Sequence, residues 1–343
     1  MNILLLSPEK SIHTERWASF LIKNGCRVVY ASFRRGYTLP QAENHFIPAE
    51  AGPVHKILRI RQIIREGRID VVNAHFLRNY GYYAFLSLFH PFVLTLWGSD
   101  YAVKRKLYDH VLPGLTLRFA EGIIVDNEDL AGKIKKIAGE KKVFVGGWGT
   151  DLSVFKPGSP KAEGPFTLLF TRGDLGIYNS DAVIRAAGLV RKRGYPLRLM
   201  ICGGIAEPGK LSALIRQAGI EDVTEVRGGL PHGEMPALFR SADAYISLAY
   251  TDQTPVSALE ALASGLPCLL SGLPSYRAAF KDCGAVMILD RDAEAVASAL
   301  VKLMENRALY AEMSHEARIF AEAYADENLL MGNSLSFIRK KAG

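Results

Sequence analysis

The feature that most constrains the fold is an alternation of short apolar runs with helical patterns, which recurs in both halves of the chain. Short apolar runs predict buried strands, and the segments between them, such as 14–23, 56–65, 180–193 and 292–305, have the spacing of amphipathic helices. Alternation of this kind predicts parallel sheets with helices on both faces. The expected strands are 2–6, 27–32, 70–74, 92–96, 122–125 and 142–145, then 167–171, 197–202, 223–227, 243–248, 267–270 and 285–288.

The length of 343 residues favours two domains, each large enough to bury a core of its own. The pattern therefore predicts an α/β protein with two facing Rossmann-like domains and an active site in the cleft between the carboxyl edges of their sheets. We expect a first domain at 1–155, a second at 156–325 and a C-terminal helix within 326–343. The turn-rich segment 156–160 would join the two domains.

Composition is that of a globular enzyme, with 49% hydrophobic and 22% charged residues. The four cysteines are scattered without a C-x-x-C pair, so neither a disulfide framework nor a zinc site is indicated, and reduced cytosolic thiols are the simplest expectation. The first residues resemble a strand and lack the basic start of a signal peptide. No apolar run reaches the roughly 18 residues that a membrane span requires.

Charge is distributed unevenly along the chain. Residues 1–150 carry 21 Lys and Arg against 13 Asp and Glu, a balance of +8, whereas the remainder carries 21 against 22. The densest basic run, 55–68, would place Lys56, Arg59 and Arg61 beside an apolar helical stripe that includes Leu58. This face could lie on anionic lipid, or it could be the hydrated side of a helix packed on the sheet. Nucleic acid is a poorer explanation, because neither a binding motif nor interleaved aromatic residues accompany the basic run.

Two carboxylates lie eight positions apart across the start of a helix, at Asp252 and Glu260. The apolar run 244–250 predicts a buried strand before them, with Thr254 as N-cap and Pro255 as first helical residue. The free N–H groups of such a helix attract an anion, and the carboxylates can bind hydroxyls, so the segment suits a nucleotide-sugar. The same pattern also fits an ordinary strand–loop–helix unit with a solvated Glu260.

Several motifs in order resemble the GT-B retaining glycosyltransferases of family 4. The segment 252–260 is similar to the family's E-x7-E region, with Asp252 in place of the first glutamate. Further matches lie along nearly the whole chain: 94–100 to the (H/W)-G-x-D turn, 147–157 to G-x-D-x-x-x-F-x-P, 170–172 to the start of the second domain, and 241–247 to the strand entering the site. No single motif is specific, but their order and spacing together are.

The resemblance implies a GT-B fold, in which the first domain lies on the acceptor side, the second binds the nucleotide-sugar, and the C-terminal helix crosses back to the first domain. It implies retaining, metal-independent transfer of a sugar from a nucleotide-sugar to a glycan or lipid-linked acceptor, at the inner face of the membrane as a cytoplasmic, peripheral protein. No cofactor is implied, and a UDP-sugar is the first guess for the donor. The implied catalytic residues are Asp252, Gly98 and Asp100; the donor-binding residues are Arg172, Asn179, Gly203, Thr254, Pro255, Val256 and Glu260; the acceptor or phosphate loop is Lys10, Ser11 and His13.

Departures from the family pattern keep other functions open. Asn179 stands nearest to the place of a lysine that shares the diphosphate with Arg172, and Lys10 or Arg277 could take its role. The alternatives are therefore a catalytically weak scaffold protein in a glycan-assembly complex and, less favoured, a nucleotide-sugar epimerase. The G-x4-G-K match at 204–210 predicts no P-loop, because Leu211 occupies the magnesium-binding position. His75 is expected to pack or cap.

Overall fold

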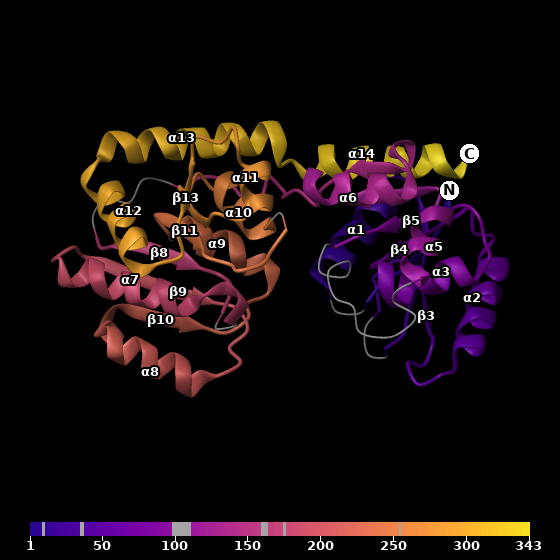
Figure 1. The fold of residues 1–343 in the computed structure, drawn as a ribbon, viewed down its shortest axis with the longest axis horizontal. Helices are drawn as coiled ribbons and strands as arrows, with labels where there is room; N and C mark the ends of the chain where they lie inside the picture. Colours follow the sequence, from indigo (N-terminus) through magenta and orange to yellow (C-terminus); the bar gives the residue numbers. More distant parts are fainter. Residues whose placement is uncertain (9–10, 35–37, 98–110, 159–163, 174–175, 254) are drawn as a thin grey trace. The chain divides into compact units, whose positions relative to one another are not determined.

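The computed structural model describes residues 1–343 except 9–10, 35–37, 98–110, 159–163, 174–175 and 254 (Figure 1). The chain forms two compact units, unit 1 comprising Met1–Trp148 with Leu329–Gly343, and unit 2 comprising Gly149–Asn328. Each unit is a parallel sheet covered by helices, which confirms the α/β class and the Rossmann-like architecture.

The sheet of unit 1 has the strand order β3-β2-β1-β4-β5-β6-β7, and all of its pairs are parallel. The strands are β1 (Asn2–Leu6), β2 (Arg27–Ser32), β3 (Glu43–Phe46), β4 (Val71–His75), β5 (Phe92–Thr95), β6 (Gly122–Val125) and β7 (Val143–Val145). Strand β3 was not among the expected strands, because this edge strand is short, polar and partly exposed, and so lacks an apolar run.

Helices cover both faces of this sheet (Figure 1). They are α1 (Ile12–Lys23), α2 (Pro53–Gly67), α3 (Tyr82–Leu86), α5 (Leu112–Phe119), α6 (Glu128–Ala138) and α14 (Glu327–Ala342). Side chains alternate along β1, so that Leu4 packs in the core with Ile63 of α2, whereas Ile3 packs in the opposite core with Trp17 of α1. Burying each such side chain stabilises the unit by about 1.5–3 kcal/mol.

The C-terminal helix α14 is part of unit 1. Met331, Leu335 and Ile338 are buried in the same core as Ile3 and Trp17. The helix lies so close to the sheet that a Cβ on Gly122 would come within 2.7 Å of the Phe337 ring. A glycine at this strand start therefore permits the helix to dock.

The sheet of unit 2 has the order β10-β9-β8-β11-β12-β13, again with parallel pairs. Its strands are β8 (Phe166–Phe170), β9 (Leu197–Cys202), β10 (Thr224–Arg227), β11 (Ala244–Ser247), β12 (Cys268–Ser271) and β13 (Val286–Leu289). The helices are α7 (Ser180–Lys192), α8 (Pro208–Ala218), α9 (Met235–Arg240), α10 (Val256–Ala263), α11 (Pro274–Ala279), α12 (Ala293–Glu305) and α13 (Arg307–Tyr324). The bounds of the six strands β8 to β13 agree with those of the expected strands to within one residue.

The boundary between the units lies before Gly149, earlier than the position after residue 155 that the sequence suggested. The intervening residues pack within unit 2. Thr150 forms a parallel bridge with Asp326, and a Cβ on Gly149 would lie 2.5 Å from the Cα of Glu327. Phe155 is buried at 1% exposure beside Phe239.

Helix α2 corrects the expectation for the basic run. Lys56 does not flank the exposed face: its Nζ donates to the carbonyl of Ala49 at 2.7 Å and lies 5.2 Å from the centre of the Phe33 ring. Burial lowers the pKa of Lys56. Leu58, expected in the buried stripe, is 57% exposed. No helix in the described parts of the chain combines the length and apolar character needed to cross a bilayer.

Candidate active site

The carboxyl edge of the unit 2 sheet brings together Arg172 and Asp252, two charged residues that the sequence singled out. In this sheet β8 pairs with both β9 and β11, so the strand order reverses direction beside β8. Ligands of open parallel sheets bind at the carboxyl ends of strands at such a switch point. Arg172 follows β8, Asp252 follows β11, and Tyr276 follows β12.

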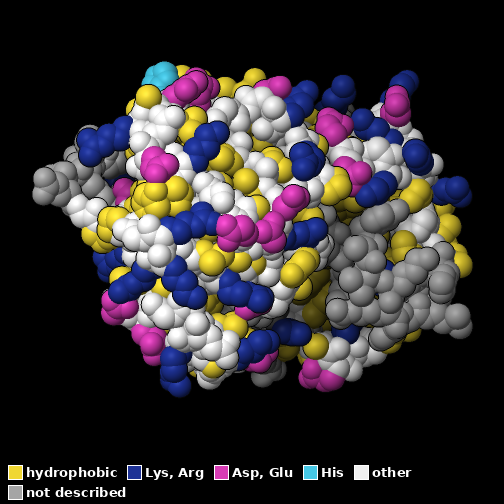
Figure 2. All heavy atoms as spheres, turned by 60° about the vertical axis from the view of Figure 1, so that its left-hand side comes forward, with side chains coloured by type: hydrophobic (Ala, Val, Ile, Leu, Met, Phe, Trp, Pro, Cys, Tyr) yellow, Lys and Arg dark blue, Asp and Glu magenta, His cyan; other side chains and the backbone are white. Residues whose placement is uncertain are grey.

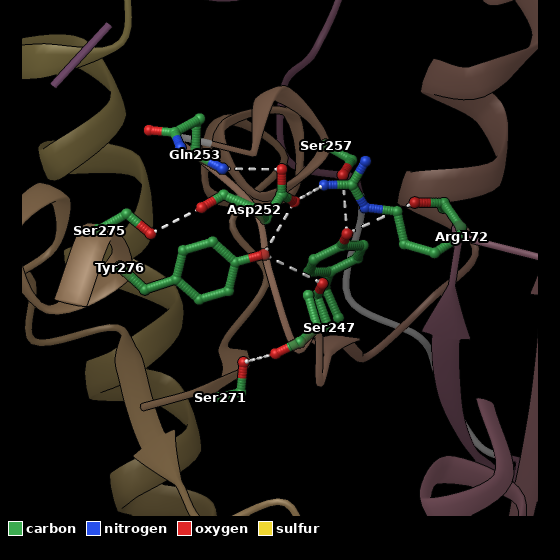
Figure 3. Close-up of polar contacts among 11 residues, drawn as sticks. Arg172, Ser247, Asp252, Gln253, Ser257, Ser271, Ser275 and Tyr276 are labelled. Atoms are coloured by element: carbon green, nitrogen blue, oxygen red, sulfur yellow. Dashed lines mark hydrogen bonds and ion pairs between the residues drawn. The ribbon is translucent and has the colours of Figure 1, made fainter. Parts of the chain in front are cut away.

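Asp252 is the centre of a hydrogen-bonded network at this edge (Figure 3). Its carboxylate forms an ion pair with Arg172 and accepts a hydrogen bond from Oη of Tyr276 at 2.9 Å. The main-chain N–H of Gln253 donates to its second oxygen at 2.9 Å. Oγ of Ser275 donates to the main-chain carbonyl of Asp252, also at 2.9 Å. Both the side chain and the backbone of Asp252 are thus fixed.

Arg172 is a largely buried cation with an unused donor. Its side chain is 19% exposed, and its guanidinium lies 4.6 Å from the centre of the Tyr178 ring, within the range of a cation–π contact. Burial opposes the charge, but the neighbouring carboxylate of Asp252 favours it, and the pKa of Arg172 is raised. Among the described residues, Nε of Arg172 has no hydrogen-bond partner. An anion at this place would therefore meet a permanently charged donor.

Two buried tyrosines lie near the charged pair. Oη of Tyr276 donates to Asp252. Burial, and to a smaller extent the nearby carboxylate of Asp252, raises the pKa of Tyr276, so its phenol stays protonated and can donate. Oη of Tyr245 forms a hydrogen bond with Oγ of Ser257 at 2.7 Å, and burial raises its pKa as well. Neutral phenols in this position keep Asp252 the negative group of the network.

Glu260 lies inside the unit rather than in solvent. Helix α10 begins at Val256 with Pro255 in the N-cap position, so the helix starts one residue later than the expected first residue, Pro255. Glu260 is 5% exposed, and its Oε1 lies 3.0 Å from Nε2 of His232. His232 in turn packs against Phe155, with ring centres 5.5 Å apart. The alternative interpretation of the sequence, in which Glu260 is exposed to solvent, is therefore wrong.

Two glycine turns meet at the same edge. Gly173 has φ +64, and a Cβ there would lie 2.0 Å from the carbonyl oxygen of Gly204. Gly203 has φ +122, and its Cβ would lie 2.8 Å from the amide nitrogen of Gly173. Only glycines permit these two backbones to approach so closely.

Asn179 lies at the start of α7. It occupies the N-cap position of that helix in a left-handed conformation, and its Nδ2 donates to the carbonyl of Arg291 at 3.3 Å. The side chain of Arg291 donates from Nη1 to the carbonyl of Ala249 at 3.3 Å and lies 4.9 Å from the centre of the Tyr250 ring. Asn179 thus secures the backbone of a second arginine next to the end of β11.

The remaining predicted residues belong to unit 1 or lie outside the described residues. Ser11 precedes α1 without a side-chain cap bond, and His13 packs against Trp97 and Trp148, with ring centres 5.3 Å and 5.2 Å apart. Lys10, Gly98, Asp100 and Thr254 lie outside the described residues. In the rejected G-x4-G-K match, Lys210 is exposed and pairs with Glu207 at 3.7 Å.

Sequence reasoning missed Tyr276, Ser275 and His232. Tyr276 and Ser275 follow β12, which pairs with β11, so they reach the same edge as Asp252. Their position shortly after a predicted buried strand could have indicated that they lie at this edge. Among the residues that the structure describes, no three His, Cys, Asp or Glu side chains form a group that could hold a metal ion.

Comparison with known proteins identifies the family. Residues 154–320 match the family model described as "Glycosyl transferases group 1", and residues 2–127 match "Glycosyl transferase 4-like". WcaL of Escherichia coli, whose name assigns it to colanic acid biosynthesis, is 27% identical over 221 residues, 61% of this chain and 54% of that protein. The match thus spans about half the length of the curated relatives.

Two solved structures share the fold over nearly the whole chain. Anabaena HepE, solved in complex with UDP, has a TM-score of 0.85 at 15% identity, covering 99% of this chain and 100% of that one. WaaG, described as a glycosyltransferase involved in lipopolysaccharide biosynthesis, has a TM-score of 0.76 at 15% identity, covering 98% and 99%.

Proposed function

The chain belongs to the group 1 glycosyltransferases, family 4 of the GT-B fold, and we propose that it transfers a sugar from a nucleotide-sugar to a glycan or lipid-linked acceptor with retained anomeric configuration. The observation that carries this proposal is the set of groups at the carboxyl edge of unit 2. A cation with an unused donor, a fixed carboxylate and a buried carboxylate lie around the start of α10. These are the partners that a diphosphate, a sugar and a ribose require.

Donor binding rearranges one ion pair. In the proposed complex Arg172 turns from Asp252 to the diphosphate, where each charged hydrogen bond contributes about 1.5–3 kcal/mol. Asp252 is still held by Tyr276 and the amide of Gln253, and one of its oxygens becomes free for a sugar hydroxyl. The amides at the start of α10, from Val256 onward, add the positive end of the helix dipole.

Glu260 is proposed to bind the ribose. Its Oε1 accepts from His232, so the carboxylate is held in one orientation within the unit. A carboxylate offers lone pairs enough to accept two ribose hydroxyls together with the histidine N–H. His232 is then the residue that orients Glu260.

Arg291 is proposed as the second cation for the diphosphate. The family lysine is absent, but Asn179, which stands in its place, binds the backbone of Arg291. Two tyrosines connect the arginines. Arg291 stacks on the ring of Tyr250, and the main-chain N–H of Tyr250 donates to the carbonyl of Ile177 at 2.8 Å. The next residue, Tyr178, stacks against the guanidinium of Arg172. Arg291 therefore takes the role for which Lys10 and Arg277 were first considered.

The reaction needs charge stabilisation at the leaving group. As the bond from the anomeric carbon to the phosphate oxygen breaks, its electron pair moves to that oxygen. The acceptor hydroxyl oxygen bonds to the anomeric carbon, and its proton passes to the departing phosphate oxygen. In this proposal Arg172, Arg291 and the α10 amides bind the negative charge that develops on the leaving group. These groups supply positive charge without a divalent cation, so we propose a metal-independent transferase without a resident cofactor.

The relatives support the donor and the pathway class. HepE was solved with UDP and with UDP-glucose, which makes a UDP-sugar the first donor to test. WcaL and WaaG are named for colanic acid and lipopolysaccharide biosynthesis, and we propose a role in surface polysaccharide or glycoconjugate synthesis on the cytoplasmic side.

A thermal-shift panel of UDP, GDP, ADP, CMP and their common sugars tests this function. A nucleotide at about 100 times its dissociation constant should stabilise the protein by roughly 2.7 kcal/mol. We expect a shift with one nucleotide class, lost in Glu260→Ala and retained in Glu207→Ala, a matched change at an exposed glutamate. No shift with any ligand would refute the transferase and favour the scaffold function, for which the asparagine at position 179 is the argument.

Peripheral membrane binding is proposed through α2. Val54 and Leu58 are 69% and 57% exposed on this helix, and Arg65 is exposed beyond them. By contrast, the face of the molecule shown in Figure 2 has basic and acidic side chains interspersed. In unit 2 such side chains form ion pairs, among them Arg191–Asp222 and Arg198–Glu225.

Vesicles containing anionic lipid test the membrane proposal. The double variant Leu58→Glu, Arg65→Glu should bind such vesicles about tenfold less well, since each basic residue near the surface contributes about 1 kcal/mol. Arg216→Glu on the exposed helix α8 is the matched control and should bind as the wild type does. Equal binding of all three proteins would exclude this face.

A further inference from the structure

The carboxyl edge of the unit 1 sheet carries a cluster of rings that the donor site does not use. His13, His75, Phe76, Trp97 and Trp148 form this ring cluster. Their positions follow strands β1, β4, β5 and β7, with His75 as the last residue of β4. The strand order places β1 between β2 and β4, so the cluster lies at the switch point of the sheet, where ligands of parallel sheets bind.

His75 lies among the other rings of the cluster. Its ring centre is 5.8 Å from that of Trp97 and 5.6 Å from that of Trp148, and the two indoles are 5.3 Å apart. His75 is fully buried, whereas Trp97 and Trp148 are half-buried at the surface of the unit. Phe76, which follows His75, has a φ of +68, and strained backbone of this kind concentrates at functional sites.

The hydrogen bonds of Asn73 fix the tautomer of His75. Nδ2 of Asn73 donates to the carbonyl of Val93 and to Oγ1 of Thr95, and a carbonyl can only accept. Oδ1 of Asn73 accepts from Nε1 of Trp17 at 2.8 Å, and an indole N–H can only donate. Both ends of the amide are thereby assigned.

Oδ1 of Asn73 lies 3.2 Å from Nε2 of His75, so Nε2 must carry the proton and donate it. Burial, together with nearby His13, lowers the pKa of His75 to about 3, so the ring is neutral at physiological pH. Nδ1 is therefore a bare lone pair that accepts a hydrogen bond. Among the described residues Nδ1 has no such partner.

We propose that the ring cluster binds a sugar ring of the acceptor, with a sugar hydroxyl donating to Nδ1 of His75 and the indole of Trp97 or Trp148 covering the apolar face of the sugar. A ligand that offers a hydroxyl donor and an apolar face satisfies both the lone pair and the rings, and a carbohydrate offers both. This proposal rests on the transfer activity proposed above, since it names the class of acceptor.

Binding has a spectroscopic consequence. Because His75 is fully buried, a hydroxyl reaches Nδ1 only when a neighbouring side chain moves, and the rings of Trp97 and Trp148 are among its neighbours. The chain has three tryptophans, and the third, Trp17, lies 6.5 Å from Trp148 by ring centres. Tryptophan emission therefore reports on this cluster.

The experiment titrates the methyl glycosides of glucose, galactose, mannose and N-acetylglucosamine into the full chain and follows tryptophan emission. Two variants separate the two nitrogens of His75. His75→Gln can retain a donor to Asn73 but has no acceptor in the place of Nδ1, whereas His75→Asn places an amide oxygen near Nδ1. Unliganded emission and thermal unfolding establish that each variant is folded.

We expect one glycoside to change the emission of the wild type saturably, with at least tenfold weaker binding to His75→Gln and binding within about threefold to His75→Asn. Trp97→Ala and Trp148→Ala each remove a ring from the surface of the cluster, and at least one of them should also weaken binding. No change with any glycoside at millimolar concentrations, wild-type affinity in His75→Gln, or wild-type affinity in both tryptophan variants would overturn the proposal. UDP thermal shifts on the same samples separate failure of the donor site from failure of this one.

Discussion

The two units build the same kind of sheet but place different chemistry on its carboxyl edge. In unit 1 the strand ends bring together rings around a neutral His75. In unit 2 they bring together Arg172, Asp252 and two protonated tyrosines. The fold thus provides two equivalent positions, and the few residues after each strand decide whether an apolar, hydroxyl-bearing ligand or an anionic one fits there.

The largest expected effect comes from removing the charge of the unit 2 edge. Arg172→Ala should weaken UDP binding by at least 100-fold, because the substitution deletes charged hydrogen bonds worth about 1.5–3 kcal/mol each. Isothermal titration measures this. Arg185→Ala, at an exposed arginine of α7, is the control and should bind UDP normally. An unchanged UDP affinity in Arg172→Ala would show that the unit 2 edge does not bind the diphosphate through this arginine.

The backbone of the same edge should tolerate little change. Gly173→Ala should lower the free energy of unfolding by roughly 2–3 kcal/mol, because its Cβ would lie 2.0 Å from a carbonyl oxygen at a φ of +64. Gly176→Ala, where a Cβ would meet nothing within 4 Å, should cost far less. Urea denaturation compares the two. Equal stabilities would show that the two glycine turns are not in close contact.

The pH dependence of stability should distinguish the unit 1 edge. The pKa of His75 falls from 6.5 to about 3 on folding, so below pH 6.5 the unfolded chain takes up a proton that the folded chain does not. Stability is therefore full above pH 6.5 and declines as the pH falls, by about 1.4 kcal/mol per unit, or roughly 2 kcal/mol at pH 5. In His75→Gln this contribution should be absent, so between pH 6.5 and 5 the variant should lose roughly 2 kcal/mol less stability than the wild type. Identical slopes in both proteins would mean that His75 titrates in the folded state.

The smallest effect should be equal in the two units. The side chain of Asn127 caps α6 in unit 1, and that of Asp292 caps α12 in unit 2. Replacing either by alanine should cost about 1 kcal/mol, since each cap satisfies helix N–H groups. Denaturation curves of the two variants would sharpen the comparison, because similar losses show that the scaffolds are alike and only the edges differ. Losses that differ by several kcal/mol would contradict this view.

The sequence predicted the scaffold better than the contacts at its edges. Apolar runs identify buried strands because burial on both faces leaves little choice of side chain, whereas the exposed β3 gave no such signal. Asp252 and Glu260 were singled out as candidates by their spacing. The partnership of Asp252 with Tyr276 was not, because it depends on which strand lies beside β11 in the sheet.

Long polar side chains were the least predictable. Lys56 has the place of a surface residue in the helical pattern, yet it reaches the carbonyl of Ala49 and two aromatic rings. Asn179 was considered for a lysine's role, but its short amide binds the backbone of Arg291. A periodic pattern predicts the direction in which a Cβ points. It does not predict which group the polar end of the side chain contacts, because that group can belong to a residue distant in sequence.

One calorimetric measurement tests the division of labour most directly: UDP titrated into the wild type, Glu260→Gln and His75→Gln. We expect Glu260→Gln to lose at least tenfold in UDP affinity, because a neutral amide cannot accept the ribose hydroxyls as the carboxylate does, while His75→Gln binds UDP as the wild type does. UDP affinity that survives in Glu260→Gln and falls in His75→Gln would place the nucleotide at the edge of unit 1 and refute the proposed donor site.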